Sequence, residues 1–275
     1  PTRKMIQFLL LLTHAVLISQ AHPVVSSSSS NQDSIKIGCI GDSITAGDHS
    51  SGGIHPYPQQ LQILLDAAYP KDMYSVTNLG ACGSTMLKES DSPYWNRTQF
   101  KTLTANTWDI VTIMLGTNDA KDGGDGGPKN WLHDCGGPLN RCTFASDYQD
   151  MINLIKTLGT TKGVSPKIYL MIPPPLMESR AIGANQTVIN SVYPQLIPLI
   201  EVANQDGDMS VIDIYTAMGG EKTWQSDENW PNSCTLNSKW EPCQWWCDAQ
   251  SCDQCHPNDN GYTHLANALK KGMLL

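Results

Sequence analysis

Five short apolar segments alternate with segments of helical periodicity, and this alternation restricts the fold more than any other feature. The apolar segments cover residues 35–40, 74–78, 110–115, 167–172 and 210–214. Between them, apolar residues repeat at the spacing of one helix face, as in Leu61, Leu64, Leu65 and Ala68, in Tyr148, Met151, Ile152 and Ile155, and in Tyr262, Leu265, Ala266 and Leu269. This order predicts a flavodoxin-like, three-layer α/β/α sandwich with a central five-stranded parallel sheet.

Two local signals predict where helices begin. Ser146, with Gln149 three residues later, predicts a capping box at the start of the helix that carries Tyr148. Pro194 and Pro198 lie within a helix-like segment, 188–205. Because proline has no N–H to donate, they predict that this helix is broken or starts late.

The strands and helices predict one domain over residues 35–275. Two stretches of irregular pattern, at about 121–143 and 219–252, predict surface insertions of the kind that often shape binding sites. A serine-rich stretch at 22–34 predicts a linker without a packing role.

The first 21 residues have the pattern of a secretory signal peptide. Arg3 and Lys4 precede a largely apolar stretch, 5–18, and Ser19 with Ala21 provides a small-x-small cleavage site. The alternative is a membrane anchor, but the stretch is short for a span. We therefore expect a secreted, extracellular protein without stable membrane insertion.

The balance of charges restricts the partners. The formal net charge is −8, and it becomes about −10 without residues 1–21, which hold two basic residues and no acid. Nucleic acids and anionic membranes require a basic face. The composition therefore argues against both as partners, and it does not determine the oligomeric state.

Sequons and cysteines agree with secretion. Asn96 and Asn185 each begin an Asn-x-Thr sequon and are candidate glycosylation sites. The nine cysteines predict disulfides, because secreted chains form them in an oxidising environment. The odd number leaves at least one thiol unpaired or paired between chains, and Cys39, in an apolar strand, is expected to be a buried small side chain. The disulfide candidates are Cys135, Cys142, Cys234, Cys243, Cys247, Cys252 and Cys255.

A glycine-flanked Asp-Ser turn follows the first apolar segment directly, as Gly41-Asp42-Ser43-Ile44-Thr45-Ala46-Gly47. A strand that runs into such a turn exposes Ser43 at the carboxyl edge of a sheet, where open α/β sheets carry their active sites. The triplet alone is a common turn, and in this reading Asp42 stabilises the turn and is not a catalytic acid.

Three further motifs follow in order: Asn78-Leu79-Gly80, Gly116-Thr117-Asn118-Asp119 and Asp253-Gln254-Cys255-His256-Pro257-Asn258. With the Asp-Ser turn they correspond to the four blocks of the GDSL/SGNH hydrolase family, which the chain resembles from about residue 35 to 269. The resemblance implies the flavodoxin-like fold, ester hydrolysis and no cofactor or metal.

Ester hydrolysis requires a nucleophile, a base and a group that orients the base. Ser43 is the expected nucleophile, His256 the base that takes its proton, and Asp253 the carboxylate that orients the imidazole. The resemblance implies an oxyanion hole formed by the backbone N–H groups of Ser43 and Gly80 and the side-chain amide of Asn118. For Asn118 the alternative is a loop cap. His55 is expected at the rim of the site, and His49, His133 and His264 have no partner visible in the sequence.

The last motif has two rival interpretations. Cys252-Asp253-Gln254-Cys255-His256 is also a Cys-x-x-Cys-His string, the attachment pattern of c-type haem. Zinc could use the same thiols together with Cys243 and Cys247. Neither interpretation explains Ser43 or Asn118. The family usually has a small aliphatic residue where Cys255 stands; a disulfide at Cys255 would brace the catalytic loop covalently.

The sequence determines the substrate less closely than it determines the reaction. Three segments resemble the branch of the family that removes acetyl groups from carbohydrates: Ser92-Pro93-Tyr94-Trp95, Asn130-Trp131 and Pro173-Pro174-Pro175. A secreted carbohydrate O-acetylesterase is therefore the favoured function. The alternatives are a lysophospholipase or thioesterase, a broad short-chain carboxylesterase, and a carbohydrate-binding module on an inactive hydrolase scaffold. Tryptophans in the insertions can stack on sugars, but packing is the more common role of any one of them.

Overall fold

A computed structural model describes residues 33–51, 55–131, 142–178, 181–205, 207–220, 234, 241–247 and 252–275. The expected signal peptide, Cys135, His133 and parts of both expected insertions lie outside the described residues. So does nearly all of the expected linker. The described part of Asp33–Leu275 forms one compact unit.

The centre of the domain is a parallel sheet whose five strands lie in the order β2-β1-β3-β4-β5. Their bounds are Ile35–Gly41 for β1, Tyr74–Gly80 for β2, Ile110–Met114 for β3, Lys167–Ile172 for β4 and Met209–Asp213 for β5. All four neighbouring pairs are parallel, as between Gly41 of β1 and its partners Gly80 of β2 and Met114 of β3. The prediction of a five-stranded parallel sheet is confirmed.

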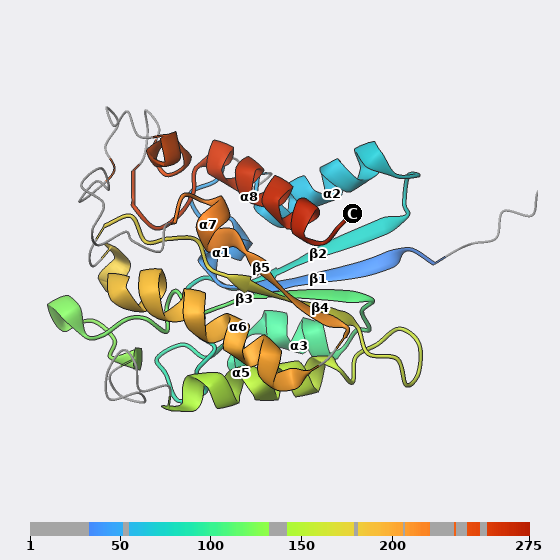
Figure 1. Cartoon of the computed structure of the whole chain (residues 1–275), viewed down its shortest axis with the longest axis horizontal. Coiled ribbons are helices and arrows are strands. Elements are labelled where there is room, and N and C mark those ends of the chain that lie inside the picture. Colours follow the sequence, from blue (N-terminus) through green and yellow to red (C-terminus); the bar gives the residue numbers. More distant parts are fainter. Residues whose placement is uncertain are drawn as a thin grey trace, which may run out of the picture. The chain divides into compact units, whose positions relative to one another are not determined.

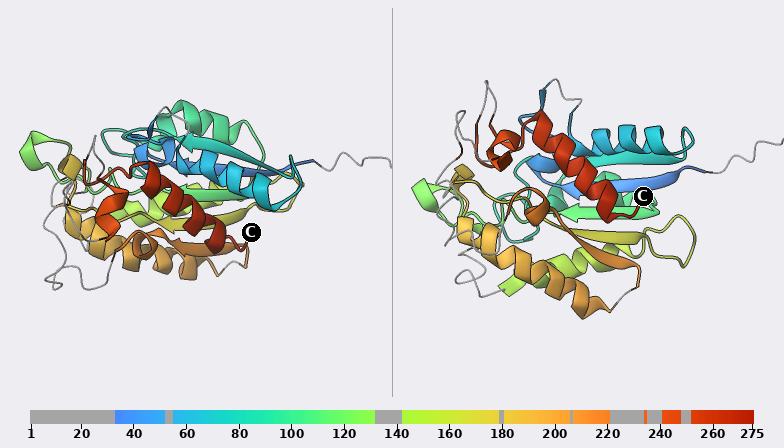
Figure 2. Two further views of the ribbon diagram at one scale, coloured as in Figure 1. Left: turned by 90° about the horizontal axis from the view of Figure 1, so that it is seen from above. Right: turned by 45° about the horizontal axis from the view of Figure 1, so that its top comes forward.

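Helices cover both faces of the sheet (Figures 1 and 2). One face carries α2 (Tyr57–Ala68), α7 (Ile214–Ala217) and α8 (Asp259–Gly272), and the other carries α3 (Thr98–Thr104), α5 (Cys142–Ile155) and α6 (Tyr193–Asn204). Successive strand residues point to opposite faces, so Val111 and Ile113 of β3 belong to one buried cluster and Ile110 and Met114 to the other. The strands are therefore apolar throughout because both faces are buried.

Two of the predicted helix starts are corrected. Ser146 lies inside α5, where its hydroxyl donates to the carbonyl of Thr143 (2.8 Å), so it does not cap the helix. Near the prolines, a π-helical turn over Val188–Val192 leads into α6, with Pro194 in its first turn and Pro198 inside it. Pro194 fits there because the first-turn N–H groups have no intrahelical partner. The helix continues past Pro198 instead of breaking there.

The strand order places a topological switch point between β1 and β3. From β1 the chain moves outward to β2, then returns past β1 to β3 and continues to β4 and β5. Ligand sites of open α/β sheets lie outside the carboxyl ends of the strands at such a point. The short helix α1 (Ser43–Ala46) follows β1 there, and Asn118 lies four residues beyond β3. The fold thus brings two separate motifs to one edge.

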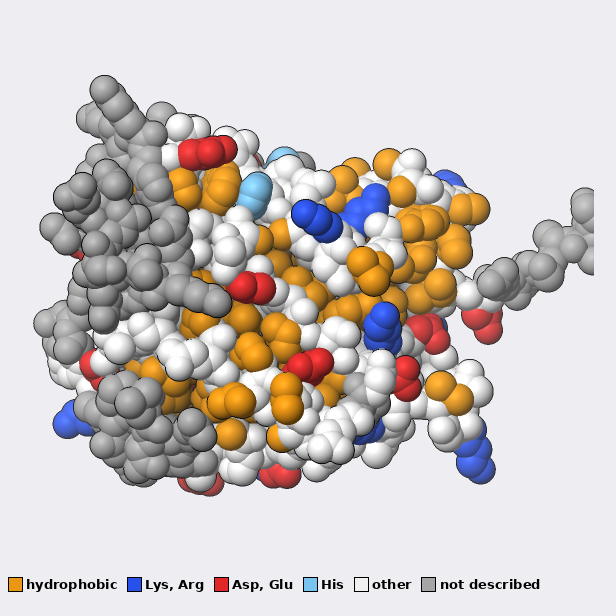
Figure 3. Space-filling model, viewed as in Figure 1, with side chains coloured by type: hydrophobic (Ala, Val, Ile, Leu, Met, Phe, Trp, Pro, Cys, Tyr) orange, Lys and Arg blue, Asp and Glu red, His pale blue; other side chains and the backbone are white. Residues whose placement is uncertain are grey.

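Basic side chains do not dominate the surface shown in Figure 3, where Lys and Arg side chains are interspersed with acidic and hydrophobic ones. Among the described residues, no helix is both long and apolar enough to cross a bilayer. The expectation that nucleic acid is not a partner stays a prediction based on composition.

The close packing of α1 against β2 leads to a first prediction, for Gly80→Ala. A Cβ atom at Gly80 would lie 2.1 Å from the backbone nitrogen of Ala46, which has no flexible side chain to move aside. We expect the substitution to lower the free energy of unfolding by roughly 1–3 kcal/mol, measured by urea denaturation. The control is Gly207→Ala, where a Cβ meets nothing within 4 Å. Equal stability of the two variants would contradict the packing described here.

Candidate active site

Ser43 is positioned by the turn that joins β1 to α1. Oδ1 of Asp42 accepts the N–H of Ile44 (2.9 Å), which caps the helix and makes Ser43 its first residue. Gly41 has no room for a side chain, because a Cβ there would lie 1.9 Å from Oγ1 of Thr45. The assignment of Asp42 to the turn thus agrees with its contacts, and burial raises its pKa to about 6 against the effect of the Ile44 N–H.

The structure brings Ser43, His256 and Asp253 into one chain of contacts. Oγ of Ser43 lies 2.8 Å from Nε2 of His256, and Nδ1 of His256 contacts Oδ2 of Asp253. An ionised Asp253 accepts the Nδ1 proton and leaves Nε2 free to take the hydroxyl proton of Ser43. Ser43 and His256 are both buried, which strengthens the electrostatic interactions between them.

The surroundings of His256 favour its charged form. Burial opposes the charge, but the hydrogen bond to Asp253 and the nearby carboxylates of Asp253, Asp48 and Asp42 outweigh it and raise the pKa of His256. For Asp253, burial opposes ionisation, and the contacts with His256 and the N–H groups of Cys255 and His256 lower its pKa overall. This pair can therefore stabilise the imidazolium that forms when Ser43 loses its proton.

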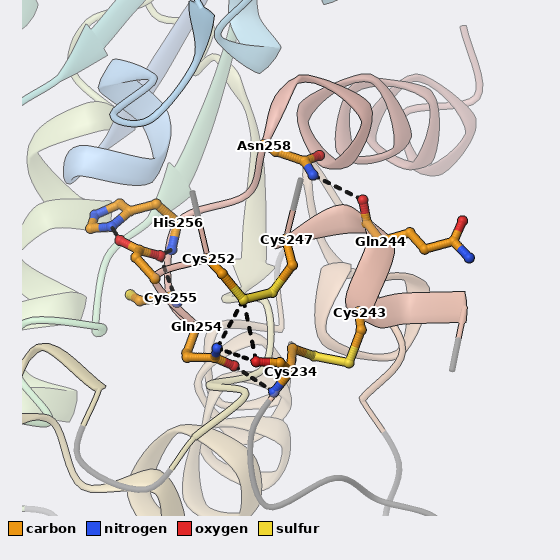
Figure 4. The surroundings of a disulfide bond; sticks show 10 residues. Cys234, Cys243, Gln244, Cys247, Cys252, Gln254, Cys255, His256 and Asn258 are labelled. Carbon is orange, nitrogen blue, oxygen red and sulfur yellow. Dashed lines mark hydrogen bonds and ion pairs between the residues drawn. A yellow bond between two sulfur atoms is a disulfide. The ribbon is translucent and has the colours of Figure 1, made fainter. Parts of the chain in front are cut away.

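The segment that carries Asp253 and His256 is held by its neighbours on several sides (Figure 4). The side chain of Gln254 donates to the carbonyl of Cys234 (2.6 Å) and accepts from its N–H (2.7 Å). The carbonyl of Gln254 accepts the N–H of Met177 (2.9 Å), which follows β4. Nothing in the sequence marks Gln254 as an anchor, because its partner Cys234 lies 20 residues away.

Four of the cysteine candidates form two disulfides, Cys234–Cys243 and Cys247–Cys252. The expectation for Cys255 is corrected: it is a free, buried thiol, and burial raises its pKa well above the ordinary range. Its side chain belongs to the buried cluster that covers the α5 and α6 face of the sheet. It thus acts as the small buried residue that the family usually has there. The Cys135 and Cys142 candidates cannot be placed, since Cys135 and the Cys142 side chain lie outside the described residues.

The disulfides bear on the rival interpretations of this segment. Cys252 is bonded to Cys247, so it cannot also form a thioether to haem or ligate zinc as a thiolate. His256 uses both ring nitrogens, on Ser43 and on Asp253. The chemistry of the donors therefore fits neither metal interpretation at Cys252-x-x-Cys255-His256.

Asn118 and Asp119 perform different tasks. The carboxylate of Asp119 accepts the N–H groups of Met86 (3.0 Å) and Leu87 (2.8 Å), and burial raises its pKa to about 7 against those bonds. The amide of Asn118 donates to the carbonyl of Ser84 (3.2 Å). Asp119 therefore holds the loop after β2, while Asn118 lies against that loop with one amide proton left to donate.

Gly80 does not have a free donor, which corrects its assignment to the oxyanion hole. Its N–H already donates to Oδ1 of Asn78 (2.9 Å), and it lies at the end of β2 against α1. Gly83 lies three residues further on, with φ +77° and next to Ser84, which Asn118 contacts. Among the described residues, the N–H of Gly83 has no hydrogen-bond acceptor. Gly83 is therefore an alternative to Gly80 as the backbone donor. The second glycine in Gly80-Ala-Cys-Gly83 is the feature of the sequence that could have suggested it.

The two sequon asparagines and the tryptophans of the insertions differ in how far they are exposed. Asn96 is exposed, whereas the Asn185 amide nitrogen, to which a glycan would be attached, donates to Asp122 (3.0 Å). Trp131 and Trp246 are fully buried, so both pack in the core.

The structure gives partners to two histidines. Nε2 of His264 lies 2.8 Å from the carbonyl of Ala217, and the ring stacks on Trp245. His49, without a partner visible in the sequence, lies against the ring of His256.

The sequence matches the model of the GDSL-like lipase/acylhydrolase family over residues 39–264. An acetylxylan esterase of Xylanibacter ruminicola is 32% identical over 202 residues, which cover 68% of this chain and 37% of that protein. The chain thus spans little more than a third of this curated relative.

Solved structures share the fold at low identity. A carbohydrate acetylesterase family member from Sinorhizobium meliloti superposes with a TM-score of 0.54 at 18% identity, covering 88% of this chain and 100% of that one. The acetyl xylan esterase AlAXEase gives 0.58 at 19% identity, covering 86% and 98%. The aryl esterase of M. smegmatis gives 0.57 at 16%, covering 88% and 99%.

The raised pKa of His256 predicts the pH dependence of activity. Only the neutral imidazole can take the Ser43 proton, so kcat/KM should rise with pH along an acid limb whose midpoint lies above about 6.5, the ordinary value. Asp253→Asn should lower turnover by on the order of 10⁴ and move this limb to lower pH, because the carboxylate that favours the cation is gone. Asp66→Asn, on the exposed side of α2, is the control. An unmoved limb in Asp253→Asn would contradict the pairing.

The disulfide at Cys234 predicts a link between covalent bracing and activity. Replacing Cys234 and Cys243 together by serine should lower the free energy of unfolding by about 2–4 kcal/mol and also lower kcat, because Gln254 is anchored on Cys234. Cys39→Ala removes a buried thiol in β1 and controls for lost stability alone. If the double variant kept parental kcat below its melting temperature, the disulfide would not position the catalytic segment.

Proposed function

Because the chain belongs to the GDSL-like lipase/acylhydrolase family and is a serine ester hydrolase, we propose that it is a secreted carbohydrate O-acetylesterase acting through an acyl-enzyme on Ser43. The observation that carries the mechanism is the line of contacts from Ser43 Oγ through both ring nitrogens of His256 to Asp253. Each member occupies the place that its chemistry requires.

In the first half of the reaction, Oγ of Ser43 attacks the ester carbonyl carbon while Nε2 of His256 takes the hydroxyl proton. The tetrahedral intermediate then expels the alcohol oxygen, which receives that proton from His256. In the second half, water gives a proton to His256 and attacks the acyl carbonyl. Collapse of this second intermediate releases the carboxylic acid and returns the proton to Ser43. Asp253 stays ionised throughout and stabilises the imidazolium.

The negative oxygen of each intermediate needs donors that are already in place. We assign this role to the backbone N–H groups of Ser43 and Gly83 and to the amide of Asn118. Asn118 uses one amide proton on the carbonyl of Ser84, so the other remains to donate. Loss of one such donor costs roughly 3–4 kcal/mol of transition-state stabilisation.

A cavity near Asn118, lined mainly by polar and charged residues, supports a carbohydrate as the alcohol part of the substrate. It has a volume of about 350 Å³ and is lined by Glu89, Ser90, Asp91, Pro128, Lys129 and Asn130. Asn130 donates to the carbonyl of Asn118 (3.0 Å) and to Asp91 (2.7 Å), which ties the cavity wall to the catalytic loop. Hydroxyl-rich sugars match such a lining better than an acyl chain does. The acetylxylan esterase relative points to the same substrate class.

Secretion rests on residues 1–21 alone, with their basic start, apolar stretch and small-x-small end. N-terminal sequencing of the protein recovered from the medium of the expressing cells tests it. A start just after Ala21 supports secretion through a cleaved signal.

The test of function compares esters that differ in acyl chain and in alcohol. The parent should release acetate from acetylated xylan and sugars and hydrolyse p-nitrophenyl acetate far faster than the palmitate ester. Ser43→Ala should lower turnover by on the order of a millionfold without changing the circular dichroism spectrum. Ser146→Ala, on the exposed face of α5, is the control. Near-parental activity in Ser43→Ala would refute the mechanism, and a preference for the palmitate ester would refute the substrate class.

A further inference from the structure

A second histidine lies over the ring of the proposed base. The rings of His49 and His256 are parallel within 3°, with centroids 5.1 Å apart. Nε2 of His49 lies 3.3 Å from Oδ2 of Asp253, the same oxygen that Nδ1 of His256 contacts. The reaction described above assigns no task to His49.

The backbone around His49 is fixed on both sides. Its φ is +63°, a conformation that costs most residues energy but in which histidine is several-fold enriched. The carbonyl of Asp48 accepts the hydroxyl of Tyr262 from α8 (2.7 Å), and the N–H of Asp48 donates to the carbonyl of Ser43 (2.9 Å). The N–H of Ser51 donates to Asp259, also in α8 (2.8 Å). This turn is therefore tied to the nucleophile and to the helix that follows the base.

We propose that His49 is a positioning residue that holds Asp253 and the ring of His256 in their reactive arrangement. Its Nε2 lies at ion-pair distance from Oδ2 of Asp253 (3.3 Å), so the polar edge of the His49 ring faces the carboxylate that orients His256. Its ring covers one face of His256 and blocks rotation of that imidazole away from Ser43. The inference rests on the proposed function, because it assigns His49 a task in the same reaction.

The arrangement also sets the basicity of His256. The charged groups around His256 are Asp253 at Nδ1, Asp48 with Oδ2 3.9 Å from Nε2, and Asp42 beneath α1; Tyr262 faces the same turn through its hydroxyl. All three carboxylates favour the imidazolium. The Nε2 edge of the His49 ring beside Oδ2 of Asp253 offsets part of that effect, so His256 stays neutral, and able to act as a base, to lower pH.

Two substitutions at the same position separate the ring from the donor. His49→Phe keeps a stacked ring but has no N–H, and His49→Gln keeps an N–H donor but has no ring. Because both variants bear the cost of the positive φ, the difference between them isolates the contact with Asp253. Asp72→Phe and Asp72→Gln, at an exposed residue that also has a positive φ (+64°) and lies before β2, are the matched controls.

We expect both His49 variants to lower kcat on p-nitrophenyl acetate roughly ten- to hundredfold while KM changes less than about twofold. In His49→Phe the acid limb of kcat/KM should move up by about half a pH unit, whereas in His49→Gln it should stay near its parental position. The Asp72 variants should match the parent in both measurements.

Parental kcat and an unmoved acid limb in His49→Phe would overturn the inference. So would equal losses in both variants that follow a fall in melting temperature, since these indicate a structural role alone. Ser43→Ala, assayed alongside, distinguishes a failure of the His49 inference from a failure of the proposed function. If it is inactive while the His49 variants match the parent, only the role of His49 is wrong. If it is active, the proposed function itself is wrong.

Discussion

The contact between Ser43 and His256 joins residues 213 positions apart in the sequence, and most of the described structure serves to fix the two ends of that 2.8 Å contact. One end depends on the sheet: β1 stops at Gly41, and the Asp42 cap turns the chain so that Ser43 begins α1. The other end depends on α8, whose N-cap Asn258 lies two residues after His256. Because α2 and α8 share one buried cluster with β1, the two ends cannot shift independently.

The two ends are stabilised by different physical means. The turn at Ser43 follows from a buried strand, a glycine without room for a Cβ, and a side-chain cap, all of which lie within residues 35–45. The segment 252–258 has no strand to hold it. Hydrogen bonds that Gln254 exchanges with Cys234, a bond from the N–H of Met177 to the carbonyl of Gln254, and the disulfides nearby hold it instead. His256 is thus oriented by crosslinks, whereas Ser43 is oriented by regular structure.

The sequence predicted the sheet well because buried parallel strands are continuous apolar runs, and each of the five expected strands lies within one residue or two of its position. It also brought Ser43, Asp253 and His256 together, because their motifs end strands or begin helices at one edge. The errors concern contacts that periodicity does not encode. Ser146 has the pattern of a cap, but α5 begins before it, and Gly80 was assigned a donor role although Asn78, two residues away, occupies its N–H.

Contacts between distant segments could not be predicted from the sequence, for a different reason. The pairing of Cys234 with Cys243, and a thiol at Cys255 that stays free, depend on which side chains face the core. The position of His49 over His256 depends on a left-handed residue in a turn that α8 fixes from the far end of the chain. Neither follows from spacing along the sequence.

The placement of the base beside the last helix has a consequence for the newly made protein. A ribosome delivers the chain from its N-terminus, and domains fold as they emerge. Ser43 and Asn118 are delivered early, whereas His256 and α8 come only after all five strands of the sheet. The nascent chain therefore carries Ser43 without its partner His256 until the segment before α8 has been made. Under the proposed mechanism, a chain that has not yet reached α8 has no base for Ser43 and is inert toward the esters of the cell that makes it.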